Sequence, residues 1–442
     1  MLDNSRRSFF KKTGYLSFGF LHLALNSQSI LAKSFSKISS KSLNKDPNKI
    51  LDIHSSLSYK IISNYGEIMD DGFNVPGYGD GMGAFSLNNK TILIRNHELE
   101  PLHGWKLSPF NSRKKDIKKL NEMHYDPKAF GGTTSIVFDE EKSVLEKQYL
   151  SLSGTLLNCA GGITPWNTWL TCEETINSRS KKDIDHGYVF EVKPSIKPFV
   201  QKPKPLKSLG RFSHEALAFD SNGNLYLTED RQDAMLYRFQ PNKYGNLDNG
   251  KLSYLLINDS KYQDTRNWND QNIKVGQKFN IDWLDIDDPD PPEDILRSNG
   301  ANLGASIFAR TEGIVYDNNY IYFICTTGGP IKRGQIWRID TSSMINKLEL
   351  WYEVSTENML NSPDNISVTP WGDLIICEDN GDLNRLWGMS KSGVPYIIAE
   401  NNYSGSEFAG ACFSPNGKTL FVNLQQNGQT IAINGNWSEL TS

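Results

Sequence analysis

The sequence predicts an all-β protein built from repeated antiparallel hairpins. In each repeat an apolar strand leads into a two-residue turn, and a second apolar strand ends at polar or acidic residues. The turns lie at Asn88-Asn89, Trp166-Asn167, Asn222-Gly223, Asn318-Asn319, Trp371-Gly372 and Asn416-Gly417. Asn-Gly between apolar strands is the strongest local signal for a hairpin. Repeated units of three or four strands indicate a β-propeller of about six blades.

The length of the chain is compatible with one large domain. At 442 residues it exceeds the usual domain size, but all-β folds often run long, so we expect residues 56–442 to form a single propeller. Uneven spacing of the hairpins predicts long insertions between blades. The largest, roughly residues 258–305, is expected to be a loop or lid with acidic residues around three prolines. A two-sheet sandwich is the structural alternative.

The amino terminus carries an export pattern. Residues 5–11 fit the twin-arginine signal at the pair Arg6-Arg7, and the apolar run that follows at residues 15–25 is too short to span a membrane stably. We expect a signal peptide over residues 1–33, a flexible linker over 34–55, and a periplasmic or secreted protein. The twin-arginine machinery would then be a partner, and it carries proteins that are already folded. A basic amphipathic first helix is the alternative.

Charge and cysteine count narrow the functional classes. The net charge of -4 gives no electrostatic case for a nucleic-acid partner. Five cysteines are too few for a disulfide scaffold, and the odd number leaves at least one free thiol. In an exported protein, binding a metal is one reason to keep a free thiol. We expect a monomer that acts on small molecules.

The segment from Leu156 to Glu174 carries the chemistry that the rest of the chain supports. Cys159 stands before a glycine pair, and Glu173 and Glu174 follow a tryptophan-rich strand. Cysteine sulfur suits iron, copper or zinc, whereas many carboxylates suit calcium or a hard trivalent ion. If the hairpins are equivalent blade strands, their acidic ends meet at one rim or in the central channel. We therefore expect a hydrolytic site that binds two kinds of metal ion. The alternative is that Cys159 is a buried core residue, as an isolated cysteine more often is.

Six motifs in order resemble those of the PhoX alkaline phosphatases. They are the Cys159 segment, Gly210–Glu215, Thr228–Arg231, Arg310–Gly313, Ile376–Asn380 and Glu407–Gly410. The resemblance runs from about residue 96 to 425, and the twin-arginine leader agrees with it. It implies a six-bladed propeller whose site holds iron (Fe³⁺) and calcium (Ca²⁺) and hydrolyses phosphomonoesters. The chain departs from the family in being short and in having Asn167 where a small residue is expected.

The resemblance also implies roles for individual residues. Cys159 would be the iron-binding thiolate, and Arg310 would hold the phosphoryl oxygens, with Glu312 as the second catalytic residue. The metal-binding carboxylates would be Glu174, Glu215 and Glu312, with Glu173, Asp230 and Glu378 as further candidates. An acidic cluster of this kind is stable mainly with metals bound, so we expect strict metal dependence.

Two other functions remain open from the sequence. A calcium-dependent propeller lactonase or esterase would need no thiolate, so a Cys159→Ser variant would stay active. A non-catalytic propeller would bind a ligand or partner at its rim and would tolerate Glu312→Gln. Fold alone does not separate these functions. The sequence contains no P-loop, no HExxH pair and no GxSxG elbow, so nucleotide, zinc-protease and serine-hydrolase chemistry have no support.

Overall fold

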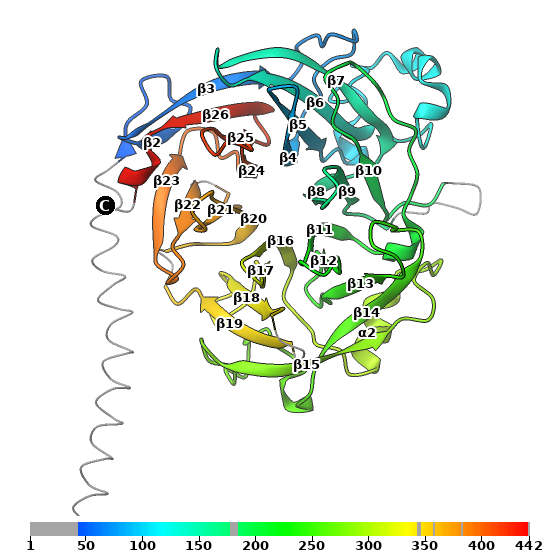
Figure 1. The fold of residues 1–442 in the computed structure, drawn as a ribbon, viewed down its shortest axis with the longest axis vertical. Helices are drawn as coiled ribbons and strands as arrows, with labels where there is room; N and C mark the ends of the chain where they lie inside the picture. The colour runs from blue at the N-terminus through cyan, green and yellow to red at the C-terminus, as the bar shows by residue number, and fades with distance from the viewer. Residues whose placement is uncertain (1–42, 177–183, 343–345, 357–358, 382, 441–442) are drawn as a thin grey trace, which may run out of the picture.

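The computed structural model describes residues 43–176, 184–342, 346–356, 359–381 and 383–440, and in this part of the chain strands dominate. They form antiparallel units arranged around a centre (Figure 1). The first two units are β4 (Gly79–Leu87), β5 (Lys90–His97), β6 (Gly131–Asp139) and β7 (Val144–Thr155), then β8 (Asn158–Ile163), β9 (Trp169–Glu173) and β10 (Val189–Val192). The next two are β11 (His214–Phe219), β12 (Leu225–Glu229), β13 (Tyr237–Pro241) and β14 (Gly250–Ile257), then β16 (Thr311–Asp317), β17 (Tyr320–Cys325), β18 (Gln335–Asp340) and β19 (Lys347–Glu353).

The last two units complete the circle. They are β20 (Pro363–Val368), β21 (Leu374–Glu378), β22 (Asn384–Met389) and β23 (Pro395–Asn401), then β24 (Phe408–Phe413), β25 (Leu420–Leu424) and β26 (Gln429–Gly435). The first strand of each unit contacts the first strand of the next, from β4 through β8, β11, β16, β20 and β24 back to β4. These six inner strands line a central cavity, the channel of the propeller. The expected propeller is confirmed, and each predicted hairpin is the inner hairpin of one unit.

The ring is closed by strands from the two ends of the domain. β3 (Leu57–Asn64) pairs antiparallel with β26, from Asn64 opposite Gln429 to Leu57 opposite Gly435. Ile431 and Ile433 on β26 are fully buried in a cluster with Leu57. The outer strand of the last unit therefore comes from the start of the domain.

The predicted linker differs from the structure over its second half. β1 (Leu43–Asn44) pairs with β2 (Asp52–His54), and β2 extends the β20–β23 sheet by pairing with β23. Leu51 is fully buried, and the buried Asp52 accepts hydrogen bonds from Lys45 and from the Tyr403 hydroxyl. These apolar and polar contacts hold residues 43–54 against the propeller. The expected signal peptide, residues 1–33, lies outside the described residues.

The largest insertion is partly regular rather than a loop throughout. β15 (Lys278–Asp285) pairs with β14 on one side and β19 on the other, so it joins two units into one sheet. It can do so because Phe279 and Ile281 alternate with polar residues and bury one face in the core. The helix α2 (Leu296–Asn302) follows, and its Gly300 packs against the ring of Tyr254. The acidic run lies at the end of β15 and in the segment before α2.

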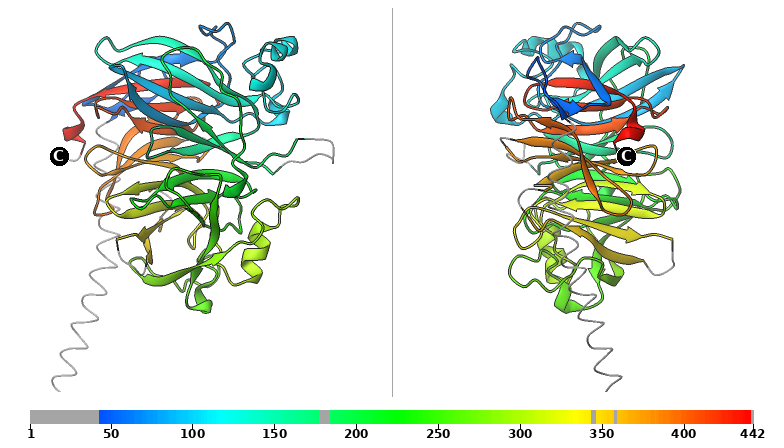
Figure 2. Two further views of the ribbon diagram at one scale, coloured as in Figure 1. Left: turned by 45° about the vertical axis from the view of Figure 1, so that its right-hand side comes forward. Right: turned by 90° about the vertical axis from the view of Figure 1, so that its left-hand side faces the viewer.

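Short 3-10 helices complete the described structure. They are η1 (Pro101–His103), η2 (Lys114–Lys119), η3 (Asn121–Met123), η4 (Lys207–Leu209), η5 (Ser260–Tyr262) and η6 (Trp437–Glu439). The segment with η2 and η3 and the segment with α2 project from the sheets (Figure 2). Among the described residues, none of the helices combines the length and the hydrophobicity that a bilayer span requires.

Candidate metal centre

A β-bulge interrupts each of the six inner strands near its start. Two residues of the inner strand stand opposite one residue of its partner at each of these places. A bulge releases its residues from the ladder and re-aims their side chains, a feature common beside active sites. The first bulged residues, in chain order, are Asp80, Cys159, Glu215, Glu312, Asp364 and Gly410. Five of the six equivalent positions thus carry a side chain that can bind a metal.

A second set of side chains comes from the ends of the neighbouring strands. In each unit, one residue of the second strand pairs with the inner-strand residue that stands just before the bulge. The residue that follows it in the chain therefore has an equivalent position in all six units. They hold Glu98, Glu174, Asp230, Thr326, Asp379 and Leu424. Four of them are carboxylates, and they lie beside the bulged residues at the same end of the channel.

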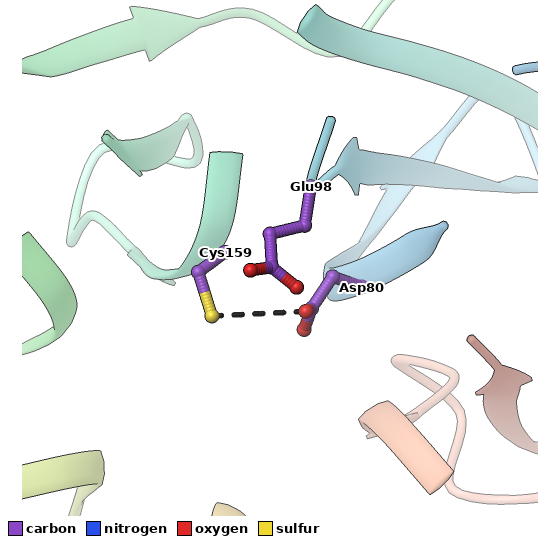
Figure 3. A group of neighbouring side chains, drawn as sticks. All are labelled: Asp80, Glu98 and Cys159. Atoms are coloured by element: carbon purple, nitrogen blue, oxygen red, sulfur yellow. Dashed lines mark hydrogen bonds between the residues drawn. The ribbon is translucent and has the colours of Figure 1, made fainter. Parts of the chain in front are cut away.

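The two sets form a continuous arc of ligand atoms. Four groups, each with ligand atoms within 4.8 Å of one another, overlap through shared members: Asp80, Glu98 and Cys159; Cys159, Glu174 and Glu215; Glu215, Glu312 and Asp364; Asp364, Asp379 and Glu407. Glu407 comes from the loop before β24. We call these nine residues the donor ring. Figure 3 shows Asp80 on β4, Cys159 on β8 and Glu98, which directly follows β5, pointing toward one another.

The Cys159 thiol lies between two carboxylates. Its Sγ is 3.1 Å from Glu215 Oε1 and 3.6 Å from Asp80 Oδ2, so the thiol can donate to either oxygen. Burial foremost, and then the charges of Asp80 and Glu215, raise the pKa of this thiol well above its usual value. A thiolate at this position therefore requires a cation beside it.

The carboxylates of the ring repel one another. Burial first, and neighbouring carboxylates second, raise the pKa of Asp80, Glu98, Glu174, Glu215, Glu312 and Glu407 well above the ordinary range. The same causes raise the pKa of Asp364 to about 7. The buried oxygen Glu215 Oε2 has no hydrogen-bond partner among the described residues. An unpartnered buried carboxylate oxygen in a ring of like charges fits a bound cation, which would neutralise the charges and occupy the free oxygen.

Arg310 stands at the edge of the ring with a strained backbone. Its φ of 53° is unusual for a residue other than glycine, and such strain clusters at functional sites. Its Nε and Nη2 donate to the two oxygens of Asp230 at 2.7 and 3.0 Å, and Nη2 is also 2.6 Å from Glu312 Oε1. The carboxylate of Glu312 foremost raises the pKa of Arg310, which is therefore always charged. Asp230 thus positions the guanidinium beside the ring.

Glu173 and Glu378 lie outside the four groups of ligand atoms among the described residues. The Glu173 carboxylate accepts from the backbone N–H groups of Leu156, Gly187 and Tyr188, and His186 Nδ1 lies 2.7 Å away. Glu378 accepts from the backbone N–H of Asn361 at 2.7 Å. Each precedes a member of the ring, Glu174 or Asp379, and successive side chains of a strand point to opposite sides. The structure therefore gives both residues a supporting position.

Sequence reasoning assigned no ligand role to Asp80, Glu98, Asp364, Asp379 and Glu407. Asp80 and Asp364 occupy the same place relative to their hairpins as Glu215 and Glu312 do. Aligning the six hairpins on their paired apolar residues would have revealed both. Two buried histidines near the ring make structural contacts: His97 lies between Gly77 O and Thr134 Oγ1, and His214 stacks on Phe212.

Comparisons with solved structures agree with the propeller fold. The structure of PhoX from Pseudomonas fluorescens, in complex with the transition-state analogue vanadate, superposes with a TM-score of 0.66 at 19% identity over 88% of this chain and 96% of that chain. A virginiamycin B lyase from Staphylococcus aureus matches with a TM-score of 0.40 at 14% identity over 86% of this chain and 98% of that chain, too weakly to carry an argument. None of the curated proteins matches.

A family model also matches the sequence. The family model described as "Alkaline phosphatase PhoX" matches residues 38–147 and 140–428, which is most of the chain. These residues include every member of the donor ring and Arg310. The resemblance found in the sequence motifs is therefore confirmed, and the chain belongs to the PhoX alkaline phosphatase family.

Proposed function

We propose that this phosphatase binds calcium and iron(III) in the donor ring and releases phosphate from small organic phosphomonoesters. One observation carries the proposal: five equivalent β-bulges deliver four carboxylates and one thiol to a single ring. Such a set would be unfavourable without cations, because its members repel one another in a buried place. Membership in a metal-dependent phosphatase family supports it.

The chemistry of the donors supports a division of the ring between two kinds of ion. Cys159 lies with Glu174 and Glu215, and a thiolate with carboxylates suits iron. Asp364, Asp379 and Glu407 form an all-oxygen group, the donor type that calcium prefers. We therefore assign iron to the side of Cys159 and calcium to the side of Asp364.

Arg310 is the residue that we expect to hold the substrate. Its Nε and Nη2 are engaged by Asp230 and Glu312, while Nη1 has no partner among the described residues and the side chain is 27% exposed. The guanidinium can therefore donate to a phosphoryl oxygen without losing the contacts that orient it. Because Glu312 belongs to the ring, Arg310 would place the phosphoryl group against the ring.

Hydrolysis of a phosphomonoester needs a nucleophilic oxygen, charge neutralisation and in-line geometry. Bound cations supply the first two by acidifying a water molecule and by neutralising the phosphoryl oxygens. The side chains of this protein supply the third, since Arg310 fixes the phosphoryl group from one side. Asp379, which is exposed, and Glu98, Glu174 and Asp364, which keep partial contact with solvent, leave the ring open to an incoming ester.

We further propose export by the twin-arginine machinery and a periplasmic or secreted monomer. The support is the Arg6-Arg7 pattern, which lies outside the described residues. The five cysteines are buried and unpaired, which suits folding before export from a reducing compartment. Replacing Arg6 and Arg7 by lysine should leave the protein in the cytoplasm, and fractionation of cells would measure this. Size-exclusion chromatography with light scattering would measure the oligomeric state.

The test of the proposed function combines metal content with turnover. Natively exported protein should contain iron and calcium, and hydrolysis of p-nitrophenyl phosphate should stop after calcium chelation and return when calcium is added. Cys159→Ser should lose iron and activity, whereas Cys172→Ser, which changes a buried thiol outside the ring, should keep both. Calcium without iron and no phosphatase turnover would overturn the proposal and favour a lactonase or esterase.

A further inference from the structure

The carboxylates at the strand ends are interrupted at two units, by Leu424 in the β24–β26 unit and by Thr326 in the β16–β19 unit, and we call the second interruption the gap. The position that holds a carboxylate after β5, β9, β12 and β21 holds Thr326 after β17. The backbone N–H of Thr326 donates to the carbonyl of Arg310 at 3.0 Å, so the gap lies directly beside the arginine that faces the ring. A dianionic ester is repelled by an acidic rim and attracted by a basic one. Because the gap adjoins Arg310 and lacks a carboxylate, an alcohol part that carries negative charge would meet the least repulsion there on leaving the ring.

Basic and aromatic side chains gather beyond this gap. Trp268 docks on the segment after β17, since its indole Nε1 donates to the carbonyl of Thr327 at 2.6 Å. The guanidinium of Arg266 lies 4.3 Å from the centre of the Trp268 ring, and the ammonium of Lys332 lies 4.6 Å from it. We call Arg266, Trp268, Lys332 and Arg333 the basic rim.

Backbone contacts place the basic rim between two residues of the site. Arg266 Nη1 donates to the carbonyl of Gln232, two residues after Asp230, at 3.1 Å. On the other side, the carbonyl of Arg333 accepts from the backbone N–H of Ser362 at 2.9 Å, and the carbonyl of Ser362 accepts from the N–H of Asp379 at 3.1 Å. The rim therefore borders the ring along the gap.

The charges of the rim are not all neutralised. Arg266 forms an ion pair with Asp264 at 2.6 Å. In contrast, no carboxylate in the described part of the chain forms an ion pair with Lys332 or Arg333. The loop that carries Trp268 is well anchored, because Asn267 Nδ2 donates to the carbonyl of Ile273 and to Glu353, both at 2.8 Å. The loop thus holds the indole at a fixed place beside the Lys332 ammonium.

We propose that the basic rim binds the alcohol part of the substrate and selects phosphomonoesters that carry a second anionic group, such as a carboxylate or another phosphate. The phosphoryl group would lie against the ring and Arg310, and the second anion would lie against Lys332 and Arg333. This inference rests on the proposed function. It names a substrate class for the same site.

A matched pair of substrates tests this specificity. Glucose 6-phosphate and 6-phosphogluconate have the same phosphorylated carbon, and only the second carries a carboxylate. We expect wild-type protein to have the higher kcat/KM for 6-phosphogluconate, and we expect this preference to shrink as salt is added. Lys332→Ala should lower the ratio of the two kcat/KM values by about fivefold, a typical effect for an exposed charge pair.

Two further variants make the result decisive. Trp268→Leu should lower the ratio in the same direction, because it removes the surface that positions Lys332. Lys243→Ala, which removes an exposed lysine from the distant β13–β14 turn, should leave the ratio unchanged. If wild-type protein hydrolyses p-nitrophenyl phosphate but the ratio is the same in Lys332→Ala, the basic rim does not bind substrate. If no phosphomonoester is hydrolysed at all, the proposed function itself is wrong.

Discussion

Gly410 offers the sharpest test of the bulge geometry. It occupies the bulged position of the sixth inner strand, where the other five strands carry ligand side chains. Its φ is +63°, and a Cβ added there would lie 2.1 Å from the carbonyl oxygen of Asp80 and 2.9 Å from the N–H nitrogen of Met82. Gly410→Ala would therefore force β24 away from β4 at the residue that begins the donor ring.

The cost can be estimated from two contributions. A positive φ costs alanine about 1 kcal/mol relative to glycine. Relieving so close a contact requires backbone movement, and overpacking of this kind costs about 1–3 kcal/mol. Gly276→Ala is the matched control, because Gly276 has a φ of +82° with nothing within 4 Å of the added Cβ. We expect Gly410→Ala to lower the free energy of unfolding by about 2–4 kcal/mol and Gly276→Ala by about 1 kcal/mol.

Urea unfolding of both variants, followed by tryptophan fluorescence, measures these free energies. Metal content measured on the same samples should fall only in Gly410→Ala, since only that variant moves Asp80. Equal losses of stability in the two variants, with unchanged metal content, would refute the argument that the sixth bulge must be a glycine because it touches Asp80.

Three other predictions follow from the ionisable groups. In metal-stripped protein the carboxyl groups of the donor ring, whose pKa values are raised, stabilise the fold most when they are protonated, below about pH 4. This stability is lost as pH rises through the pKa of Asp364, about 7. The melting temperature of the metal-stripped protein should therefore fall between pH 4 and 8, and restoring the metals should prevent the fall. His186, between Glu173 and Asp126, has its pKa raised to about 9, so its contribution is complete below pH 6.5 and lost through pH 9; His186→Gln should cost about 3 kcal/mol at pH 6 and little at pH 10, measured by urea unfolding. Arg310→Lys keeps the positive charge but loses the planar guanidinium with its several N–H donors, so kcat/KM should fall about a hundredfold with metal content unchanged.

Local sequence patterns predicted the inner hairpins because turn chemistry is local. Asn88 and Asn89 have φ values of 50° and 59°, as a tight hairpin turn requires, and such turns are visible in the sequence. The pairing of β3 with β26 and the bridging role of β15 were not predicted. Both join segments far apart in the chain, and no short-range pattern encodes which distant edge a strand will meet.

The site residues that could be predicted from the sequence were those that lie in a recognisable motif. Cys159, Glu174, Glu215 and Glu312 were expected as metal ligands, and the structure brings these four together. Adjacent acidic pairs such as Glu173-Glu174 were ambiguous, because strand alternation and the position of the bulge decide which member faces the channel. Asp80 and Asp364 were missed because no single hairpin marks the bulged position, and the signal lies only in the offset that they share with Glu215 and Glu312.

The seam between β3 and β26 sets the order in which the site can form during synthesis. This closure brings the last unit against the first, where Asn423 Nδ2 donates to the carbonyl of Asp80 on β4 at 2.6 Å and Gln425 Nε2 to its carboxylate at 2.7 Å. A ribosome delivers the first of these residues hundreds of positions before the others. The group of Asp364, Asp379 and Glu407, and the hydrogen bonds that hold Asp80, therefore form only when the last strands have been made. Completion of the polypeptide thus decides when the calcium side of the proposed site can be loaded.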